Sequence, residues 1–195
     1  MPVDRHTETL LTLIQRIGDL KVLSRTGWLL AGVADAESIA DHTTGVAVLA
    51  LFLAECVNTD PVGQGLTHPL DVAAVTHLAL IHDLAESVLT DLPKRAAARL
   101  SEQVKHDAEA AIIKDVLGAL PNAPHYLELW RCYVDASTPE ARLVKDVDKL
   151  EMVAQALRYS ARGQRNLDEF WEGHRWFYPL CQQLYDSLLG QWLPG

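Results

Sequence analysis

The sequence has few of the features that mark secreted, membrane-spanning or disulfide-stabilised proteins. Its three cysteines are odd in number, far apart and without CxxC spacing, which is typical of reduced packing residues in a cytosolic protein. The first ten residues, MPVDRHTETL, carry charges and hydroxyls where a signal peptide has its apolar region. Every apolar run is broken by Asp, His or Glu before about 18 residues, too early for a membrane helix. We therefore expect a soluble cytoplasmic protein with no membrane partner.

Basic charge is also scarce. The formal net charge is −9, and the sequence contains neither a basic tail nor a basic stripe. A protein whose main partner is a nucleic-acid backbone needs a clustered cationic footprint, so we expect no nucleic-acid polymer as a partner. A small anionic substrate remains compatible with this charge, because a few local cations and a metal are enough to hold it.

Patterns typical of strands, repeats and low-complexity tracts are missing as well. Apolar residues make up 49% of the chain and charged residues 22%, which is ordinary for a soluble globular protein. A chain of 195 residues allows one domain with a large core, whereas two domains would be cramped. We predict an all-α, single-domain helical bundle over residues 1–195, with its core at about 20–165 and an aromatic C-terminal segment, 166–195, packed on it.

Apolar residues recur at helical spacing along most of the chain. Ser38, with Asp41 three residues later, approximates a capping box, and Pro93 is placed to stop a helix that Asp71 caps. The segment 24–35 has two glycines and no helical period, so we predict a loop there. Helices are predicted at 8–23, 39–57, 72–89 and 94–117, in a shorter segment around 127–134, and from Pro139 to the terminator Gly163.

The chemically unusual stretch is LALIHDLAESVLTDLP, residues 78–93. His82 and Asp83 stand side by side in a run otherwise built for burial, and ionisable side chains are rarely buried without a partner. On one helix these two side chains point about 100° apart, and Glu86 lies over the same patch one turn later. Two explanations are open: a metal ion between them, or a hydrogen-bonded core histidine with Asp83 as its ion-pair partner.

A metal ion would need further ligands from other buried helices. His42, in the first turn of the predicted helix 39–57, qualifies. On the helix that begins at Pro139, either Asp146 or Asp148 could serve. A stripe through the apolar residues of that helix places Asp146 nearer the buried centre and Asp148 nearer its edge, so periodicity alone favours Asp146.

The order His42, His82-Asp83, Asp148 resembles the HD-domain metal-dependent phosphohydrolases, which are marked by a His, a His-Asp pair and a distant Asp. Four ordered segments resemble more closely the 5′-deoxynucleotidase branch of that family, in bacteria and eukaryotes. They are RTGW at 25–28, ESIADH at 37–42, HDLAESVLTDLP at 82–93 and KDVDKLEM at 145–152. The likeness runs from about residue 20 to 171.

The resemblance implies a ligand set of His42, His82, Asp83 and Asp148, because the Lys-x-x-Asp segment of the family maps to Lys145 and Asp148. Asp146 is then the alternative. Two nitrogens and two carboxylates suit one divalent transition metal, Mn²⁺, Co²⁺, Fe²⁺, Ni²⁺ or Zn²⁺, better than Ca²⁺. Binuclear relatives use additional histidines, but His68 and His77 match no such position, so one metal is expected.

The resemblance also implies a function: hydrolysis of (deoxy)nucleoside 5′-monophosphates to nucleoside and phosphate. The metal would polarise a phosphate oxygen and lower the pKa of a bound water. Glu86 is the expected proton-transfer residue, and Asp91 is expected near the sugar or the attacking water. Arg25 and Lys94 are the expected phosphate contacts and Trp28 packs near sugar or base, while His82 and Asp148 also face the substrate. A homodimer is implied as well.

Two other functions stay open. One is a phosphodiesterase or pyrophosphohydrolase acting on other nucleotides, which should need a longer basic groove or more histidines. The other is a nucleotide-binding sensor without turnover, which has no evident need for both Glu86 and Asp91. Where some bacterial members have Thr-Gly-Asp, this chain has Leu89-Thr90-Asp91, and that difference bears on base preference more than on reaction class.

Overall fold

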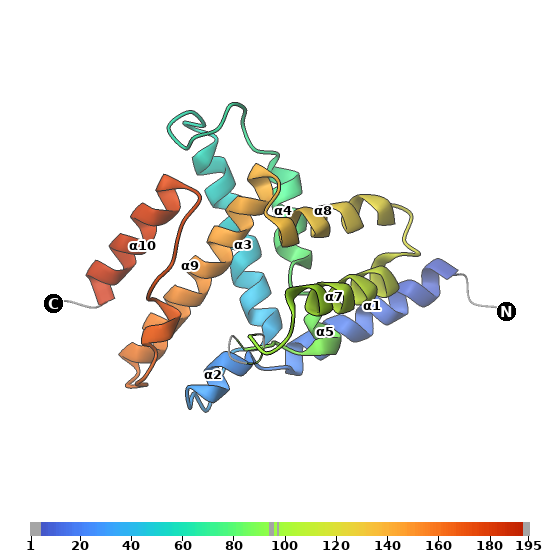
Figure 1. Cartoon of the computed structure of the whole chain (residues 1–195), viewed down its shortest axis with the longest axis horizontal. Coiled ribbons are helices and arrows are strands. Elements are labelled where there is room, and N and C mark those ends of the chain that lie inside the picture. The colour runs from blue at the N-terminus through green and yellow to red at the C-terminus, as the bar shows by residue number, and fades with distance from the viewer. Residues whose placement is uncertain (1–4, 94–95, 97, 193–195) are drawn as a thin grey trace.

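The computed structural model describes residues 5–93, 96 and 98–192, and within them the fold is all-α, as predicted (Figure 1). These residues form no strand, and their one isolated bridge joins Ser24 to Ser38. The helices are α1 (Arg5–Val22), α2 (Thr26–Leu30), α3 (Ile39–Val57), α4 (Val72–Ile81), α5 (Glu86–Leu89), α7 (Glu102–Leu117), α8 (Ala123–Asp135), α9 (Pro139–Ala161) and α10 (Pro179–Trp192), with the short 3₁₀ helix η1 (Asp168–Phe170).

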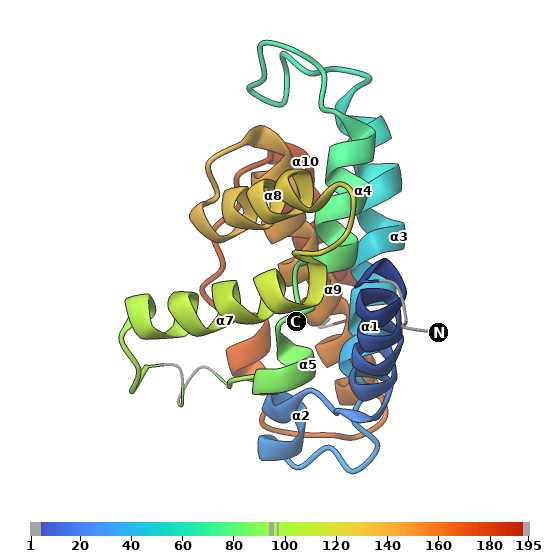
Figure 2. The same ribbon diagram turned by 90° about the vertical axis from the view of Figure 1, so that its right-hand side faces the viewer.

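Three helices, α3, α4 and α9, pack on one another to form the centre of the molecule. Figure 2 shows α3 and α4 side by side, with α1 against one end of α3. The shared core is aliphatic, and its members include Val46, Val75, Leu78, Val147 and Leu150. Helix α10 lies against the far side of α9 (Figure 1), with Cys181 buried in the same core. Burial of this surface orders the three helices that carry the site described below.

Local capping determines where the two site-bearing helices α3 and α9 begin. The Ser38 hydroxyl accepts a hydrogen bond from the Asp41 amide at 3.1 Å, and the Asp41 carboxylate accepts one from the Ser38 amide at 2.9 Å. This complete capping box starts α3 and places His42 in its first turn. At α9, the Thr138 hydroxyl accepts from the Ala141 amide at 3.2 Å and Pro139 takes the first helical position.

The predicted loop 24–35 contains the short helix α2, so this prediction was wrong in part. Tertiary packing stabilises this helix: the Trp28 side chain is only 1% exposed and packs on Tyr159 and Phe170. The apolar residues of the segment do not recur at helical spacing. A five-residue helix is too short to be stable alone, which explains why the sequence pattern does not reveal it.

The predicted helix 72–89 is interrupted, and this too corrects the sequence-based expectation. Helix α4 ends at Ile81, and α5 starts at Glu86. Between them the amides of Leu84 and Glu86 bond to carbonyls three residues earlier, which is the tighter 3₁₀ pattern. His82 adds a hydrogen bond from its own ring to the Ala79 carbonyl at 2.8 Å. The His-Asp pair therefore stands at the junction of α4 with this tighter turn.

By length and composition alone, two stretches, Ile39–Val57 and Val72–Leu89, are long and apolar enough to cross a membrane. This is weak support for a membrane span, because the core helix of a soluble protein passes the same test. Both stretches contribute to the central core. The absence of a membrane partner therefore stays a prediction.

Thr90, which ends α5, has a backbone conformation that β-branched residues rarely adopt: φ is 61° and ψ is 166°. Its side chain is exposed, so little packing is lost on its removal. We expect Thr90→Gly to raise the free energy of unfolding by about 1 kcal/mol, because relief of about 1–3 kcal/mol of strain exceeds the extra chain entropy of glycine. Urea denaturation would measure it.

The matched control is Thr44→Gly, at an exposed position in regular helix α3. There glycine should lower the free energy of unfolding by about 0.3 kcal/mol, because threonine is itself a weak helix former. Equal destabilisation by both variants would show that Thr90 is not strained.

Candidate metal-binding active site

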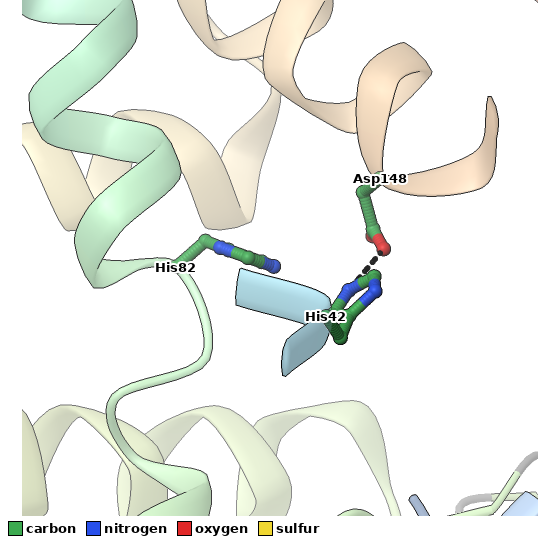
Figure 3. Close-up of side chains that lie close together, drawn as sticks. All are labelled: His42, His82 and Asp148. Atoms are coloured by element: carbon green, nitrogen blue, oxygen red, sulfur yellow. Dashed lines mark ion pairs between the residues drawn. The ribbon is translucent and has the colours of Figure 1, made fainter. Parts of the chain in front are cut away.

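Three central helices bring two histidines and an aspartate together. His42 comes from α3, His82 from the end of α4 and Asp148 from α9, and one ligand atom of each lies within 4.8 Å of the others (Figure 3). His42 Nε2 is 3.1 Å from Asp148 Oδ1. Asp83 Oδ2 lies 3.1 Å from His82 Nε2 and 3.6 Å from His42 Nε2. The structure therefore brings together all four residues predicted as ligands.

The two imidazole rings are oriented by acceptors on their outer nitrogens. His42 Nδ1 is 2.6 Å from Glu151 Oε2, and His82 Nδ1 is 2.8 Å from the Ala79 carbonyl. Because such partners keep the proton on Nδ1, both Nε2 atoms are free to act as ligands. Both are buried, and neither has a hydrogen bond of acceptable geometry within the described residues. This donor set, two imidazoles with two carboxylates, fits a divalent transition metal.

The carboxylates of the site stabilise positive charge among them. Burial and Arg25 lower the pKa of His42, but Asp148 and Glu151 outweigh them and raise it to about 10. Burial would raise the pKa of Asp83, but His82 and Arg25 hold it at about 2. The pKa of Asp148 is likewise lowered despite burial, chiefly by His42. The carboxylates thus stabilise the protonated, positively charged form of His42. The same negative charge would stabilise a metal cation bound in place of the proton.

Glu86 begins α5 beside this cluster but does not belong to it. Burial raises its pKa well above the usual value, and the neighbouring Asp83 carboxylate raises it further. Its Oε2 atom is buried without a hydrogen-bond partner in the described part of the chain. A carboxyl group with a raised pKa and a free oxygen can both accept and release a proton, which is what general acid–base catalysis requires.

Arg25 and Asp91 lie at the entrance to the cluster, where both line the two cavities described below. An Arg25 guanidinium nitrogen donates to Asp83 Oδ2 at 3.2 Å. Burial alone would lower the pKa of Arg25, but Asp83 and Asp148 raise it above its usual value, so the group stays charged. Asp91 accepts a hydrogen bond from the Gly27 amide at 3.3 Å, which ties the end of α5 to α2. Lys94, predicted as a second phosphate contact, lies outside the described residues.

Two cavities meet at this entrance. The smaller, of about 320 Å³, has a polar lining that includes His82, Asp83, Asp148, Glu86, Tyr133 and Lys145. The larger, of about 740 Å³, is walled by Trp28, Met152 and Phe170. The Trp28 and Phe170 rings lie 4.2 Å apart between centroids. Both cavities share four lining residues, Arg25, Asp91, Leu92 and Lys105. A ligand with an anionic end and an aromatic end could therefore span the two.

Three residues of the site were not predicted from the sequence. The Tyr133 hydroxyl donates to Asp148 Oδ2 at 3.2 Å, and the Lys145 ammonium lies 4.2 Å from the centre of the Tyr133 ring. Glu151 supports His42. Lys145 and Glu151 stand three residues before and after Asp148, one helical turn on each side, so their spacing could have indicated them. Tyr133 gives no such signal, because only the packing of α8 on α9 brings it close.

Asp146, favoured by helix periodicity, serves another purpose. It is fully buried, as the periodicity indicated. One carboxylate oxygen accepts hydrogen bonds from the amides of Phe177 and Tyr178 at 2.7 and 2.9 Å, and the other pairs with Lys149 at 2.8 Å. Asp146 thus anchors the chain that leads into α10, and its oxygens are occupied away from the histidine cluster.

Comparison with known proteins agrees with this geometry. The sequence model of the HD domain family matches residues 17–175. The Schizosaccharomyces pombe protein named 5′-deoxynucleotidase hdd1 is 32% identical over 179 residues, covering 87% of this chain and 83% of its own. Human 5′-deoxynucleotidase HDDC2 is 31% identical over 153 residues, 77% of this chain and 68% of its own.

Solved structures give the same result for the fold. The PH0347 protein of Pyrococcus horikoshii superposes with a TM-score of 0.75 at 38% identity, covering 92% of this chain and 96% of its own. A conserved hypothetical protein of Pyrococcus furiosus superposes with a TM-score of 0.71 at 38% identity, covering 94% of both chains.

Proposed function

Because this chain belongs to the HD domain family, we propose that it hydrolyses nucleoside 5′-monophosphates, with a preference for deoxyribonucleotides, to nucleoside and phosphate. The observation that carries the proposal is the pair of buried Nε2 atoms of His42 and His82, which make no hydrogen bond within the described residues and lie 3.1 Å from carboxylate oxygens of Asp148 and Asp83. Beside them is the Oε2 atom of Glu86, which also makes no hydrogen bond among those residues. Relatives named as 5′-deoxynucleotidases share most of the chain, which supports the substrate class.

We propose that His42, His82, Asp83 and Asp148 hold one divalent transition metal, Mn²⁺, Co²⁺, Fe²⁺, Ni²⁺ or Zn²⁺. When bound, such a metal supplies Lewis-acid activation of a phosphate oxygen and of water. His82 and Asp148 also line the smaller cavity, so they face the substrate phosphate as well as the metal. Arg25 and Lys145 provide positive charge in that cavity, and Lys94 is a further proposed contact.

Glu86 handles the proton in this proposal. As the water oxygen bonds to phosphorus, Glu86 takes the water proton, and the bond from phosphorus to the 5′-oxygen breaks. Glu86 then returns that proton to the departing 5′-oxygen, which leaves as the nucleoside hydroxyl. The raised pKa of Glu86, from burial and Asp83, suits a group that must both accept and donate.

The nucleoside is placed in the larger cavity. Phe170, Met152 and Trp28 contribute apolar lining there. Asp91 lies where the two cavities meet, which is where the sugar of a nucleotide spanning them would be. A carboxylate held by the Gly27 amide at that point can disfavour a 2′-hydroxyl by crowding.

A phosphate-release screen tests the function. With Mn²⁺ or Co²⁺ added, we expect phosphate from deoxynucleoside 5′-monophosphates, less from the ribonucleotides, and none after treatment with EDTA. Deoxynucleoside 3′-monophosphates are the matched control and should remain intact. No release from any 5′-monophosphate at high enzyme concentration would refute the proposal. Cleavage of cyclic or polyphosphorylated nucleotides instead would identify a phosphodiesterase or pyrophosphohydrolase, and thermal stabilisation without product a sensor.

We also propose that the chain forms one domain and acts as a cytoplasmic homodimer. Large apolar side chains are exposed on two helices that contact each other, α1 and α3. They are Leu10, Leu11, Ile14, Ile17, Val48 and Phe52. Exposed apolar surface of this kind is typical of subunit interfaces.

A further inference from the structure

We propose that Glu151 is a positioning residue for His42, and that Gly45 is a glycine because Glu151 needs the space beside it. The inference rests on the proposed metal site. It concerns the side of the His42 ring that faces away from the other ligands, where Glu151 of α9 reaches across to α3.

The contact between Glu151 and His42 is the first part of the argument. Glu151 Oε2 lies 2.6 Å from His42 Nδ1, and the His42 side chain is completely buried. A carboxylate in that position sets both the tautomer and the rotation of the ring, and so the direction of the Nε2 lone pair. Glu151 is therefore positioned to affect the affinity of Nε2 for a metal.

Gly45 is the second part. It lies in the middle of α3, three residues after His42 and on the same helical face. Glycine inside a helix is unfavourable relative to alanine, so its presence needs a reason. A Cβ atom on residue 45 would lie 2.9 Å from Glu151 Oε1, 3.0 Å from Cγ and 3.2 Å from Cδ. The end of the Glu151 side chain would have to shift to make room, and its Oε2 atom is the one that contacts His42.

A second carboxylate limits where Glu151 could go instead. Ligand atoms of Glu37, His42 and Glu151 lie within 4.8 Å of one another. Glu37 is held by a hydrogen bond from Trp28 Nε1 at 2.9 Å. Movement of Glu151 toward Glu37 would bring two carboxylates closer together, and movement away from His42 would lose the contact with Nδ1. A methyl group at residue 45 should therefore move Glu151 and, through it, change the orientation of the His42 ring.

The test is a double-mutant cycle with metal affinity as its readout. Titration of the metal-free protein with MnCl₂ or CoCl₂ in a calorimeter gives the Kd. We expect Gly45→Ala and Glu151→Ala each to weaken binding about 10- to 100-fold. The double variant should bind no more weakly than Glu151→Ala alone, because Gly45 acts only through Glu151. Glu151→Gln, whose amide oxygen can still accept from Nδ1, should restore part of the affinity.

Gly18→Ala is the matched control. Gly18 also lies inside a helix, α1, but a Cβ there would have no atom within 4 Å. Its Kd should equal that of the wild type, and the Tm of the metal-free protein should show that each variant is folded. Wild-type affinity in Gly45→Ala, or additive losses in the double variant, would overturn the inference. Failure of the wild type to bind either metal would instead refute the proposed metal site.

Discussion

Replacing Glu86 by Gln is expected to lower kcat by about 10²–10⁴-fold while the protein keeps its metal. Glutamine preserves the volume of the side chain but cannot take up a proton. Glu86 lies outside the histidine cluster, so its loss should leave metal content unchanged. Steady-state rates with a deoxynucleoside 5′-monophosphate, together with metal analysis of the purified protein, measure both effects.

Glu109→Gln is the control for that experiment. Glu109 lines the smaller cavity too, but its carboxylate is paired with Lys105 at 3.3 Å. This variant should keep a kcat close to that of the wild type. The comparison distinguishes the loss of any negative charge from the cavity from the loss of the proton-transfer group. A Glu86→Gln protein with an unchanged kcat would exclude Glu86 as the proton-transfer residue.

The two acids of α9 are expected to respond in opposite ways. Asp148→Ala should abolish metal binding and activity, because it removes a proposed ligand, and should cost less stability than Asp146→Ala, because the Asp148 side chain is partly exposed at a cavity. Asp146→Ala should lower the free energy of unfolding by about 3–5 kcal/mol, because it leaves Lys149 and two backbone amides without their buried partner. Metal analysis and urea denaturation of both variants give the comparison.

Each variant serves as the control for the other, since they remove the same group two positions apart on one helix. If Asp146→Ala lost the metal and Asp148→Ala retained it, the ligand assignment would be reversed. The expected result is a folded, metal-free Asp148→Ala protein and a destabilised Asp146→Ala protein that still carries metal.

These two acids also show where sequence patterns stop being informative. Residues two apart on a helix point about 200° apart, so Asp146 and Asp148 face opposite sides of α9. Helix α9 is central, and it packs on α10 on one side and on α3 and α4 on the other. Periodicity identified Asp146 as buried but could not tell a structural contact from a ligand. Family resemblance pointed to Asp148, and the structure places that residue with the histidines.

Local interactions explain which helix boundaries could be predicted. Helix α3 runs from Ile39 to Val57, as expected, because its capping box involves residues only three apart. The break between α4 and α5 was missed, because a run without glycine or proline gives no local reason to stop at Ile81. At the interruption the His82 ring forms a hydrogen bond with the Ala79 carbonyl. The spacing of apolar residues in the sequence carries no information about such a bond.

The sequence by itself determined the all-α class and most of the helices, and the resemblance of four ordered segments indicated the family and the proposed ligand residues. The class and the helices follow from short-range spacing, namely caps and apolar stripes, whereas the family and the proposed ligands follow from the resemblance alone. Only the tertiary structure decided that Glu151 supports His42, that Gly45 gives it room, and that Tyr133 reaches Asp148. Those contacts join residues on different helices, and they exist because burial of the shared core packs α3, α4, α8 and α9 together.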